Sequence, residues 1–303
     1  MNPLICNIAR CSLHDGEGVR TVVYLKGCNL RCLWCHNPEG IRPEKEILLY
    51  PSRCIKCGRC AELCPEHHMI SGGEPVFIRD GLCVKCGRCA DACPNGALLL
   101  CGEERTEKEL LTEILKDKPY YDNSGGGVTF SGGECLLYPE FLAHTLSLCR
   151  KASVDTAVET ALCVPWENIE KVMPFTDAFI VDIKHADNDK HRVLTGRGNG
   201  LILENLCRLS QLHNNICIRV PLIPTVNDDD ENLCNTALII NSLGCGVKKV
   251  ELLKYNNMAA GKYEALGLTA KIFAAMPQSE EEIRQKRRFF RALLREGIEL
   301  CGE

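Results

Sequence analysis

The sequence contains no long hydrophobic run and no large excess of charge of either sign. No segment approaches the ~18 uninterrupted apolar residues of a membrane span, so we expect no membrane partner. Lys and Arg together number 36 and Asp and Glu number 40, which leaves no basic surplus for binding nucleic acid. The first ten residues include Pro3, Asn7 and Arg10 and therefore lack the apolar core of a secretory signal. We expect a cytoplasmic, monomeric protein.

Cysteine is the residue in excess, with 22 in a chain of 303 residues. The other proportions, 45% hydrophobic and 25% charged, are those of an ordinary globular protein with one large domain, or one domain plus a small insertion. A disulfide scaffold would be a short secreted chain, which this is not. The cysteines are therefore expected to be reduced, and part of them to be metal ligands.

Two segments of the chain repeat each other. Residues 54–65 and 83–94 share nine of twelve residues, and each has the spacing C-x2-C-x2-C-x3-C-P of bacterial ferredoxins. In two-cluster ferredoxins, the fourth cysteine of each run binds the other cluster. We therefore assign one 4Fe–4S cluster to Cys54, Cys57, Cys60 and Cys93, and a second to Cys83, Cys86, Cys89 and Cys64. A pair of zinc knuckles is the alternative, and the duplicated run disfavours it.

A third group of cysteines, Cys28, Cys32 and Cys35, has the different spacing C-x3-C-x2-C and no fourth member. Three thiolates on a four-iron cluster leave one iron without a protein ligand, and a metal centre needs such an open position to bind substrate. A zinc site completed by His36 is the alternative. The other eleven cysteines have no ligand spacing, and most are expected to be core residues: Cys6, Cys11, Cys101, Cys135, Cys149, Cys163, Cys207, Cys217, Cys234, Cys245 and Cys301.

Outside the ferredoxin-like segment, short β-type runs alternate with helical patterns. The expected strands are 21–25, 128–130, 156–159, 178–182, 216–220 and 250–253, and the expected helices are 106–116, 139–151, 165–172, 201–212 and 229–243. Six such repeats predict an α/β fold, an open, partial six-fold β/α barrel with parallel strands. Residues 1–49 and 101–303 would form this barrel, and residues 50–100 a ferredoxin-like insertion that carries two 4Fe–4S clusters.

The segment 280–296 predicts a basic amphipathic helix near the end of the chain. One interpretation is a solvated helix whose Phe289 and Leu293 point inward. The other interpretation is a docking surface for an acidic partner.

Five segments together resemble the glycyl-radical-enzyme activating enzymes of the radical S-adenosylmethionine (SAM) superfamily. They are residues 14–21, 27–38, 124–134, 181–184 and 219–224, and the likeness extends over nearly the whole chain. The ferredoxin-like insertion is similar to that of the subgroup which activates dehydratases, decarboxylases and related lyases. The activator of pyruvate formate-lyase resembles the chain without this insertion.

The resemblance implies an oxidoreductase. A 4Fe–4S cluster on Cys28, Cys32 and Cys35 would cleave SAM reductively to methionine and a 5′-deoxyadenosyl radical, which would take a hydrogen atom from a backbone glycine of a partner glycyl radical enzyme. The ferredoxin-type clusters would relay electrons from an external ferredoxin or flavodoxin. Two alternatives stay open: a radical SAM enzyme acting on a small molecule or peptide, and a non-catalytic electron carrier.

The resemblance also implies roles for residues at the carboxyl ends of the strands, where such folds place their chemistry. Trp34 and His36 would border the adenine, and Lys184 would meet the methionyl carboxylate. Further cofactor-binding positions are Gly132, Gly133, Glu134, Glu159, Asp182, Ile183, Arg219 and Asn256. A monovalent cation would lie at Glu159, Thr160 and Asp182. Alternatively, these acids form structural salt bridges with Lys184 or Arg219.

Two positions depart from the family pattern. Asn256 stands where the family usually has histidine, so this position needs only a hydrogen bond if the site works normally. Glu17 replaces the usual proline, which predicts a less rigid entry loop.

Overall fold

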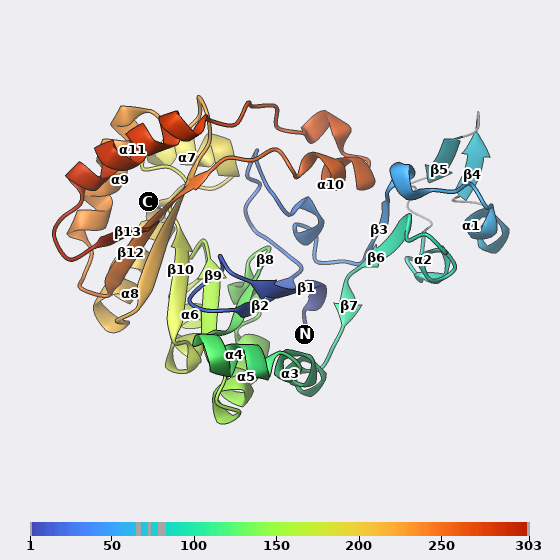
Figure 1. Ribbon diagram of the computed structural model, residues 1–303, viewed down its shortest axis with the longest axis horizontal. Helices are drawn as coiled ribbons and strands as arrows, with labels where there is room; N and C mark the ends of the chain where they lie inside the picture. Colours follow the sequence, from blue (N-terminus) through green and yellow to red (C-terminus); the bar gives the residue numbers. More distant parts are fainter. Residues whose placement is uncertain (1, 65–67, 72–73, 78–82, 302–303) are drawn as a thin grey trace.

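The computed structural model describes residues 2–64, 68–71, 74–77 and 83–301. Its centre is a nine-stranded sheet with the order β13-β12-β11-β10-β9-β8-β2-β1-β7. Its strands are β1 (Leu4–Ser12), β2 (Arg20–Leu25), β7 (Glu103–Glu104), β8 (Gly127–Gly132), β9 (Asp155–Thr160), β10 (Ala178–Asp182), β11 (Ile216–Leu222), β12 (Val247–Lys254) and β13 (Glu299–Cys301). The neighbours from β2 to β13 are parallel, whereas β1 and β7 continue the sheet as antiparallel strands (Figure 1).

The expected open parallel barrel is confirmed. The six expected strands are β2, β8, β9, β10, β11 and β12, and the sheet ends at β13 on one side and at β7 on the other. The sequence pattern does not predict β13, because three residues are too few to show an alternation. Nor does it predict β1, whose apolar residues are interrupted by Asn7 and Arg10.

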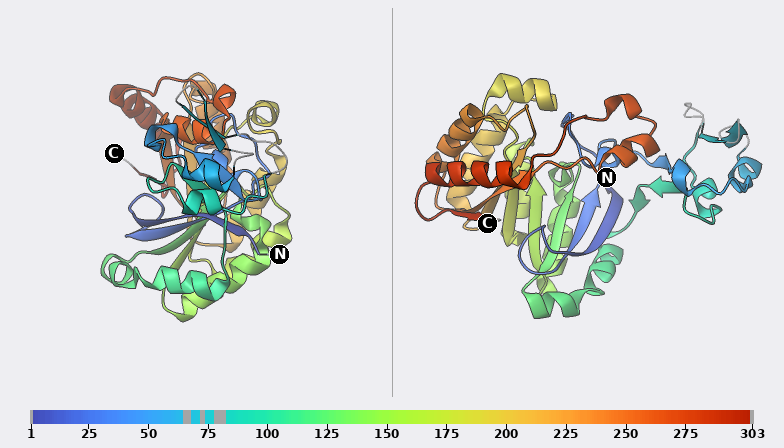
Figure 2. Two further views of the ribbon diagram at one scale, coloured as in Figure 1. Left: turned by 90° about the vertical axis from the view of Figure 1, so that its right-hand side faces the viewer. Right: turned by 45° about the horizontal axis from the view of Figure 1, so that its top comes forward.

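Helices lie outside the curved sheet (Figures 1 and 2). They are α3 (Glu107–Leu115), α4 (Lys118–Ser124), α5 (Pro139–Lys151), α6 (Trp166–Val172), α7 (Asn188–Thr195), α8 (Gly200–Leu212), α9 (Asp230–Ser242) and α11 (Glu280–Leu293). Leu142 and Leu146 of α5 and Leu206 of α8 are fully buried in one core with Phe130 and Val181 of the sheet. Removing this apolar surface from water, at about 25 cal/mol per Å², is the main force that holds the helices on the sheet.

Helix α11 buries two residues more fully than the two expected to point inward. Its fully enclosed side chains are Ile283 and Phe290, while Phe289 and Leu293 are only partly buried against the same core. Ile283 and Phe290 are two helical turns apart and therefore share one face, which packs into the main core.

The insertion lies to one side of the barrel (Figures 1 and 2). Two antiparallel strands join it to the barrel: β3 (Glu46–Leu49) and β6 (Leu98–Cys101). Between them lie η2 (Pro51–Arg53), α1 (Arg59–Leu63), β4 (His68–Ser71), β5 (Glu74–Phe77) and α2 (Arg88–Asp91). The other short helices are η1 (Pro38–Gly40), η3 (Cys135–Leu137), η4 (Met173–Phe175), α10 (Ala260–Ala265) and η5 (Thr269–Lys271). Among the residues described above, no helix is long and apolar enough to cross a membrane.

Strand β8 approaches β9 closely at its first residue. A Cβ atom at Gly127 would lie 2.0 Å from the carbonyl oxygen of Asp155, its register partner on β9. A side chain at this position would therefore push apart two strands in the middle of the sheet.

We expect Gly127→Ala to lower the free energy of unfolding by about 2 kcal/mol or more, because the neighbouring backbone cannot yield without breaking the ladder. Gly200→Ala is the matched control. A Cβ atom there meets nothing within 4 Å, and the residue begins α8, so stability should change by less than about 1 kcal/mol. Anaerobic chemical denaturation measures both variants, and equal stabilities would contradict the steric argument.

Candidate active site

The carboxyl ends of the parallel strands enclose a cavity of about 460 Å³. It brings together twelve of the residues expected at the site: Cys28, Cys32, Trp34, Cys35, His36, Gly132, Gly133, Glu159, Thr160, Asp182, Lys184 and Asn256. Glu134, Ile183 and Arg219 are not among the lining residues. Ser131, which belongs to the expected segment 124–134, also lines the cavity, as does Arg287, which carries no local sequence signal for this position.

The three thiols lie on the loop that follows β2. Hydrogen bonds from the main chain fix this loop: Cys28 N donates to Ile41 O at 3.0 Å, and Leu33 N donates to Leu194 O at 3.0 Å. Burial raises the pKa of Cys28 to about 12 and that of Cys35 to about 11. Thiolates at these positions therefore need a nearby positive charge, which bound iron supplies. Three such thiols facing one cavity fit a cluster that lacks a fourth protein ligand.

The end of β8 is packed directly against this loop. Gly133 N donates to Leu25 O at 2.9 Å, and Glu134 N donates to Gly27 O at 2.8 Å. A Cβ atom at Gly133 would lie 2.2 Å from Gly27 O, so this position accepts only glycine. Main-chain atoms, rather than side chains, therefore form this wall of the cavity, and a ligand can approach them closely.

Glu134 supports the wall from behind. Its buried carboxylate accepts hydrogen bonds from Thr160 Oγ1 at 2.8 Å, Ala161 N at 3.0 Å and Leu136 N at 3.1 Å. These bonds join the loops that follow β8 and β9. Ile183 has a similar supporting place, since it is buried in the main core.

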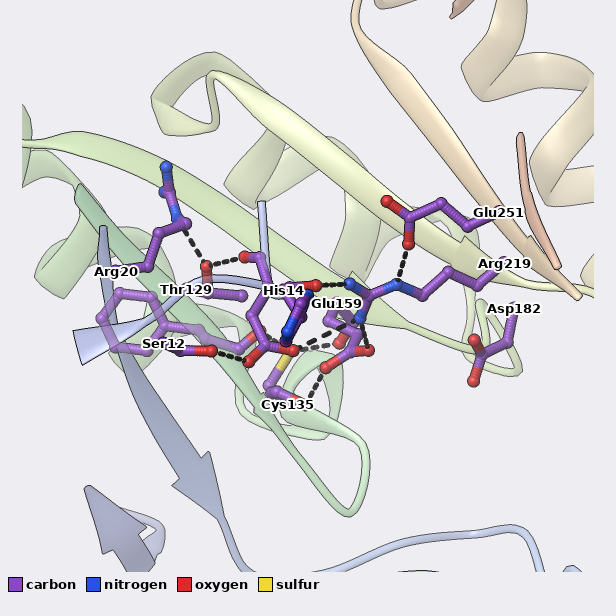
Figure 3. Close-up of polar contacts among 12 residues, drawn as sticks. Ser12, His14, Arg20, Thr129, Cys135, Glu159, Asp182, Arg219 and Glu251 are labelled. Atoms are coloured by element: carbon purple, nitrogen blue, oxygen red, sulfur yellow. Dashed lines mark hydrogen bonds and ion pairs between the residues drawn. The ribbon is translucent and has the colours of Figure 1, made fainter. Parts of the chain in front are cut away.

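Arg219 lies in the middle of β11 and pairs with three acids, of which Glu159 and Glu251 are labelled in Figure 3. Its Nη1 atom lies 2.6 Å from Glu159 Oε1 and 3.4 Å from Asp15 Oδ1, and its Nε atom lies 2.8 Å from Glu251 Oε2. It also donates to the carbonyl of His14. Burial would lower the pKa of Arg219, but Glu159 and Glu251 raise it above its ordinary value. The guanidinium group thus pairs with acidic side chains of the protein itself and not with a ligand in the cavity.

A second ion pair lies on the cavity wall itself. Lys184 Nζ is 2.6 Å from Asp182 Oδ2. Burial would lower the pKa of Lys184, but Asp182 raises it above its ordinary value, so the ammonium group stays charged. The salt bridges considered from the sequence, with Lys184 and with Arg219, are therefore both present. The partners Asp15 and Glu251 are additional, because nothing local in the sequence connects them to Arg219.

The opposite wall is apolar. Trp34, Ile223 and Tyr255 are buried together in a small cluster, and the rings of His36 and Tyr255 have centroids 6.1 Å apart. Burial lowers the pKa of His36, so its imidazole is neutral at pH 7. Asn256 lies beside this cluster, and its Oδ1 accepts a hydrogen bond from Met258 N at 3.2 Å. A flat, uncharged ring system is the ligand group that such a wall suits best.

The cysteines of the insertion gather in two groups. Cys54, Cys57, Cys60 and Cys93 line one small cavity, although Cys93 comes from the second ferredoxin run. Burial, with nearby Cys64 and Cys83, raises the pKa of Cys89 to about 11, so Cys64 lies beside the other group. Pro65, the proline of the first run, lies outside the described residues. The places of Cys93 and Cys64 agree with the crossed arrangement typical of two-cluster ferredoxins.

Comparisons with known proteins match both parts of the chain. Residues 91–237 match the Radical SAM superfamily, and residues 53–98 match a 4Fe-4S dicluster domain. The (2S)-3-sulfopropanediol dehydratase activating enzyme of Klebsiella oxytoca is 42% identical over 89% of this chain and 87% of that protein. The trans-4-hydroxy-L-proline dehydratase activating enzyme of Clostridioides difficile is 41% identical over 96% of this chain and 97% of that protein.

A solved structure is also similar in fold. Streptococcus suis SuiB bound to the precursor peptide SuiA superimposes with a TM-score of 0.55 and 11% sequence identity, covering 93% of this chain and 48% of that one. This likeness concerns the fold alone.

We expect Glu134→Ala to lower the free energy of unfolding by about 2–4 kcal/mol, because it leaves the Thr160 hydroxyl and two N–H groups buried without an acceptor. Glu140→Ala removes an exposed carboxylate that pairs with Lys171 and should cost less than about 1 kcal/mol. Chemical denaturation of both variants provides the measurement. A Glu134→Ala protein as stable as Glu140→Ala would show that Glu134 does not support the wall.

Proposed function

Because the chain belongs to the glycyl-radical-enzyme activating enzymes of the radical SAM superfamily, we propose that the cavity at the carboxyl end of its sheet is where SAM is cleaved and the partner's glycine is presented. The observation that carries this proposal is the convergence of three buried thiols, a glycine-lined wall and Lys184 on one cavity. Enzymes of this family use iron–sulfur chemistry and SAM to activate a glycyl radical enzyme. When bound, the cluster supplies the electron that splits SAM into methionine and a 5′-deoxyadenosyl radical, which takes a hydrogen atom from a partner glycine.

The task of this chain's own residues is placement. Lys184 binds the methionyl carboxylate, supported by its charge and by its place on the wall beside the three thiols. The main chain at Gly132 and Gly133 receives the methionyl amino group, since no side chain intervenes there. Trp34 and His36 border the adenine on the apolar wall. Holding the reacting groups in one geometry can remove several kcal/mol, roughly 7–11, from the barrier of such a reaction.

The proposal also includes a monovalent cation beside Glu159, Thr160 and Asp182. All three line the cavity. Burial raises the pKa of Glu159 above its ordinary value; Arg219 opposes this shift and Asp182 adds to it. A small cation between the two carboxylates would offset their repulsion. Ser131, whose hydroxyl donates to Glu159 at 2.5 Å, would then keep that acid oriented.

The insertion supplies electrons in this proposal. We infer three 4Fe–4S clusters in all: one on Cys28, Cys32 and Cys35, and two held by the eight cysteines of the insertion. A ferredoxin or flavodoxin would reduce the insertion first. A cytoplasmic location suits this chemistry, because so many thiolate ligands need a reducing compartment. The protein would act on its partner as a monomer.

The decisive experiment is the formation of the partner's radical. Reduced, reconstituted enzyme mixed with SAM and a glycyl radical enzyme encoded beside it should give the doublet of a carbon radical in electron paramagnetic resonance. Cys32→Ala should reduce this doublet by more than about 100-fold, because the cluster on Cys28, Cys32 and Cys35 then loses one of its three thiolate ligands. Cys207→Ser is the control, since Cys207 is exposed and remote from any ligand spacing. SAM cleavage without a doublet would indicate a small-molecule or peptide substrate, and an absence of cleavage would indicate an electron carrier.

The cluster count and the relay are tested together. Anaerobic reconstitution should give about twelve irons per chain, as three 4Fe–4S clusters require.

Replacing both Cys57 and Cys86 by Ala should slow reduction of the remaining cluster by a protein donor at least about tenfold, because the path through the insertion is broken. Reduction by dithionite, a small reagent, should be affected much less. An unchanged rate with the protein donor would exclude the relay.

A further inference from the structure

Two of the eleven cysteines without a ligand spacing, Cys6 and Cys101, meet at the base of the insertion. They are 95 positions apart in the sequence, and their sulfur atoms lie 3.2 Å apart. Cys6 belongs to β1 of the barrel, and Cys101 is the last residue of β6. The pairing of β1 with β2 shifts register between Ile5 and Asn7, so Cys6 occupies an irregularity of the ladder. Such irregularities re-aim side chains, here toward the insertion.

The two thiols differ in access. Cys101 is 4% exposed and belongs to a small core with Leu48 of β3 and with Ala265 and Leu266 at the end of α10. Cys6 is partly exposed and lines a cavity of about 100 Å³. A small reagent in solution therefore reaches Cys6 before it reaches Cys101.

The buried cation Lys26 lies beside the less accessible thiol. Its Nζ atom is 3.7 Å from Cys101 Sγ and 3.1 Å from Glu46 Oε2. The hydrogen bond between the two thiols, together with burial, raises the pKa of Cys6; the same hydrogen bond, with Lys26 and against burial, lowers the pKa of Cys101. Because either sulfur can be the donor in this hydrogen bond, the two thiols titrate as a pair and share the first thiolate. The thiolate is the form of cysteine that attacks a disulfide bond, so Cys101 is suited to the second step of an exchange.

We propose that Cys6 and Cys101 are a reversible redox pair that closes by exchange with a low-molecular-weight disulfide. The Cys6 sulfur attacks the reagent, forms a mixed disulfide and releases one reagent thiol. The Cys101 sulfur then attacks the Cys6 sulfur, closes the intramolecular disulfide and releases the second reagent thiol. Two electrons and two protons pass from the cysteine pair to the two reagent thiols, so the exchange balances without another oxidant.

Closure would fasten β6, by which the chain leaves the insertion, to β1 of the barrel. The enclosed segment, residues 6–101, contains the three-thiol loop and the whole insertion. In reduced compartments disulfides are usually transient and sense oxidation, and a pair at this junction is suited to that role. Neither Cys6, Cys101 nor Lys26 lines the active-site cavity of about 460 Å³, so a failure of the redox proposal and a failure of the proposed function can be told apart.

The test uses the anaerobic holoenzyme, incubated with excess glutathione disulfide, then alkylated, digested and analysed by mass spectrometry. We expect peptides linked through Cys6 and Cys101 to be at least about tenfold more abundant than any other linked pair, because their sulfur atoms already lie 3.2 Å apart. Dithiothreitol should reverse the link. Unchanged visible absorption of the clusters will show that exchange, and not cluster loss, produced it.

Two variants complete the test. Cys101→Ser should stop at the first step and accumulate a glutathione adduct on Cys6. Cys217→Ser, which removes another partly exposed cysteine of the sheet, should leave closure unchanged. The proposal is wrong if the protein with both cysteines in place keeps the glutathione adduct on Cys6 and forms no Cys6–Cys101 disulfide. It is equally wrong if both thiols stay free under conditions that modify the exposed Cys207.

Discussion

The close approach of three backbones, those of β2, β8 and β9, determines where the cavity lies. Strand β8 has glycine near both ends, because carbonyl oxygens of its neighbours leave no room for a side chain at Gly127, beside Asp155, or at Gly133, beside Gly27. The same proximity lets Glu134 N donate to Gly27 O, which holds the three-thiol loop against the strand. Main-chain hydrogen bonds with the sheet therefore fix the position of the loop, and its cysteines are held as firmly as the sheet to which the loop is bonded.

Charge is arranged in two layers beneath this loop. Lys184 and Asp182 pair on the cavity wall, while Arg219 lies deeper and neutralises Glu159 and Glu251. Burying such groups singly would cost several kcal/mol each, so each charge has a partner within the protein. A structural role for these acids and a role in binding are therefore compatible. A ligand that carries both an ammonium and a carboxylate group can exchange partners with the Lys184–Asp182 pair without leaving a buried charge alone.

The parts of this protein that sequence reasoning predicts are those whose information is local. The cysteine spacings predict the grouping of Cys54 with Cys93 because a ferredoxin run specifies its own geometry. The alternation of apolar residues predicts β8 to β12 for the same reason. By contrast, Asp15 reaches Arg219 from 204 positions away, and Cys6 reaches Cys101 from 95. Contacts of this kind depend on how the whole sheet is assembled, and no window of residues contains them.

The way in which the insertion is joined to the barrel has a consequence for the evolution of the fold. Because β3 and β6 are paired, with Glu46 opposite Cys101 and Leu49 opposite Leu98, the chain leaves the barrel and returns to it at one place. For the barrel, the intervening residues are equivalent to a tight hairpin, and the entropy of closing that connection depends little on what is placed beyond it. An iron–sulfur module can thus be gained, exchanged or lost at this point while the barrel keeps its core, its strand order and its cavity.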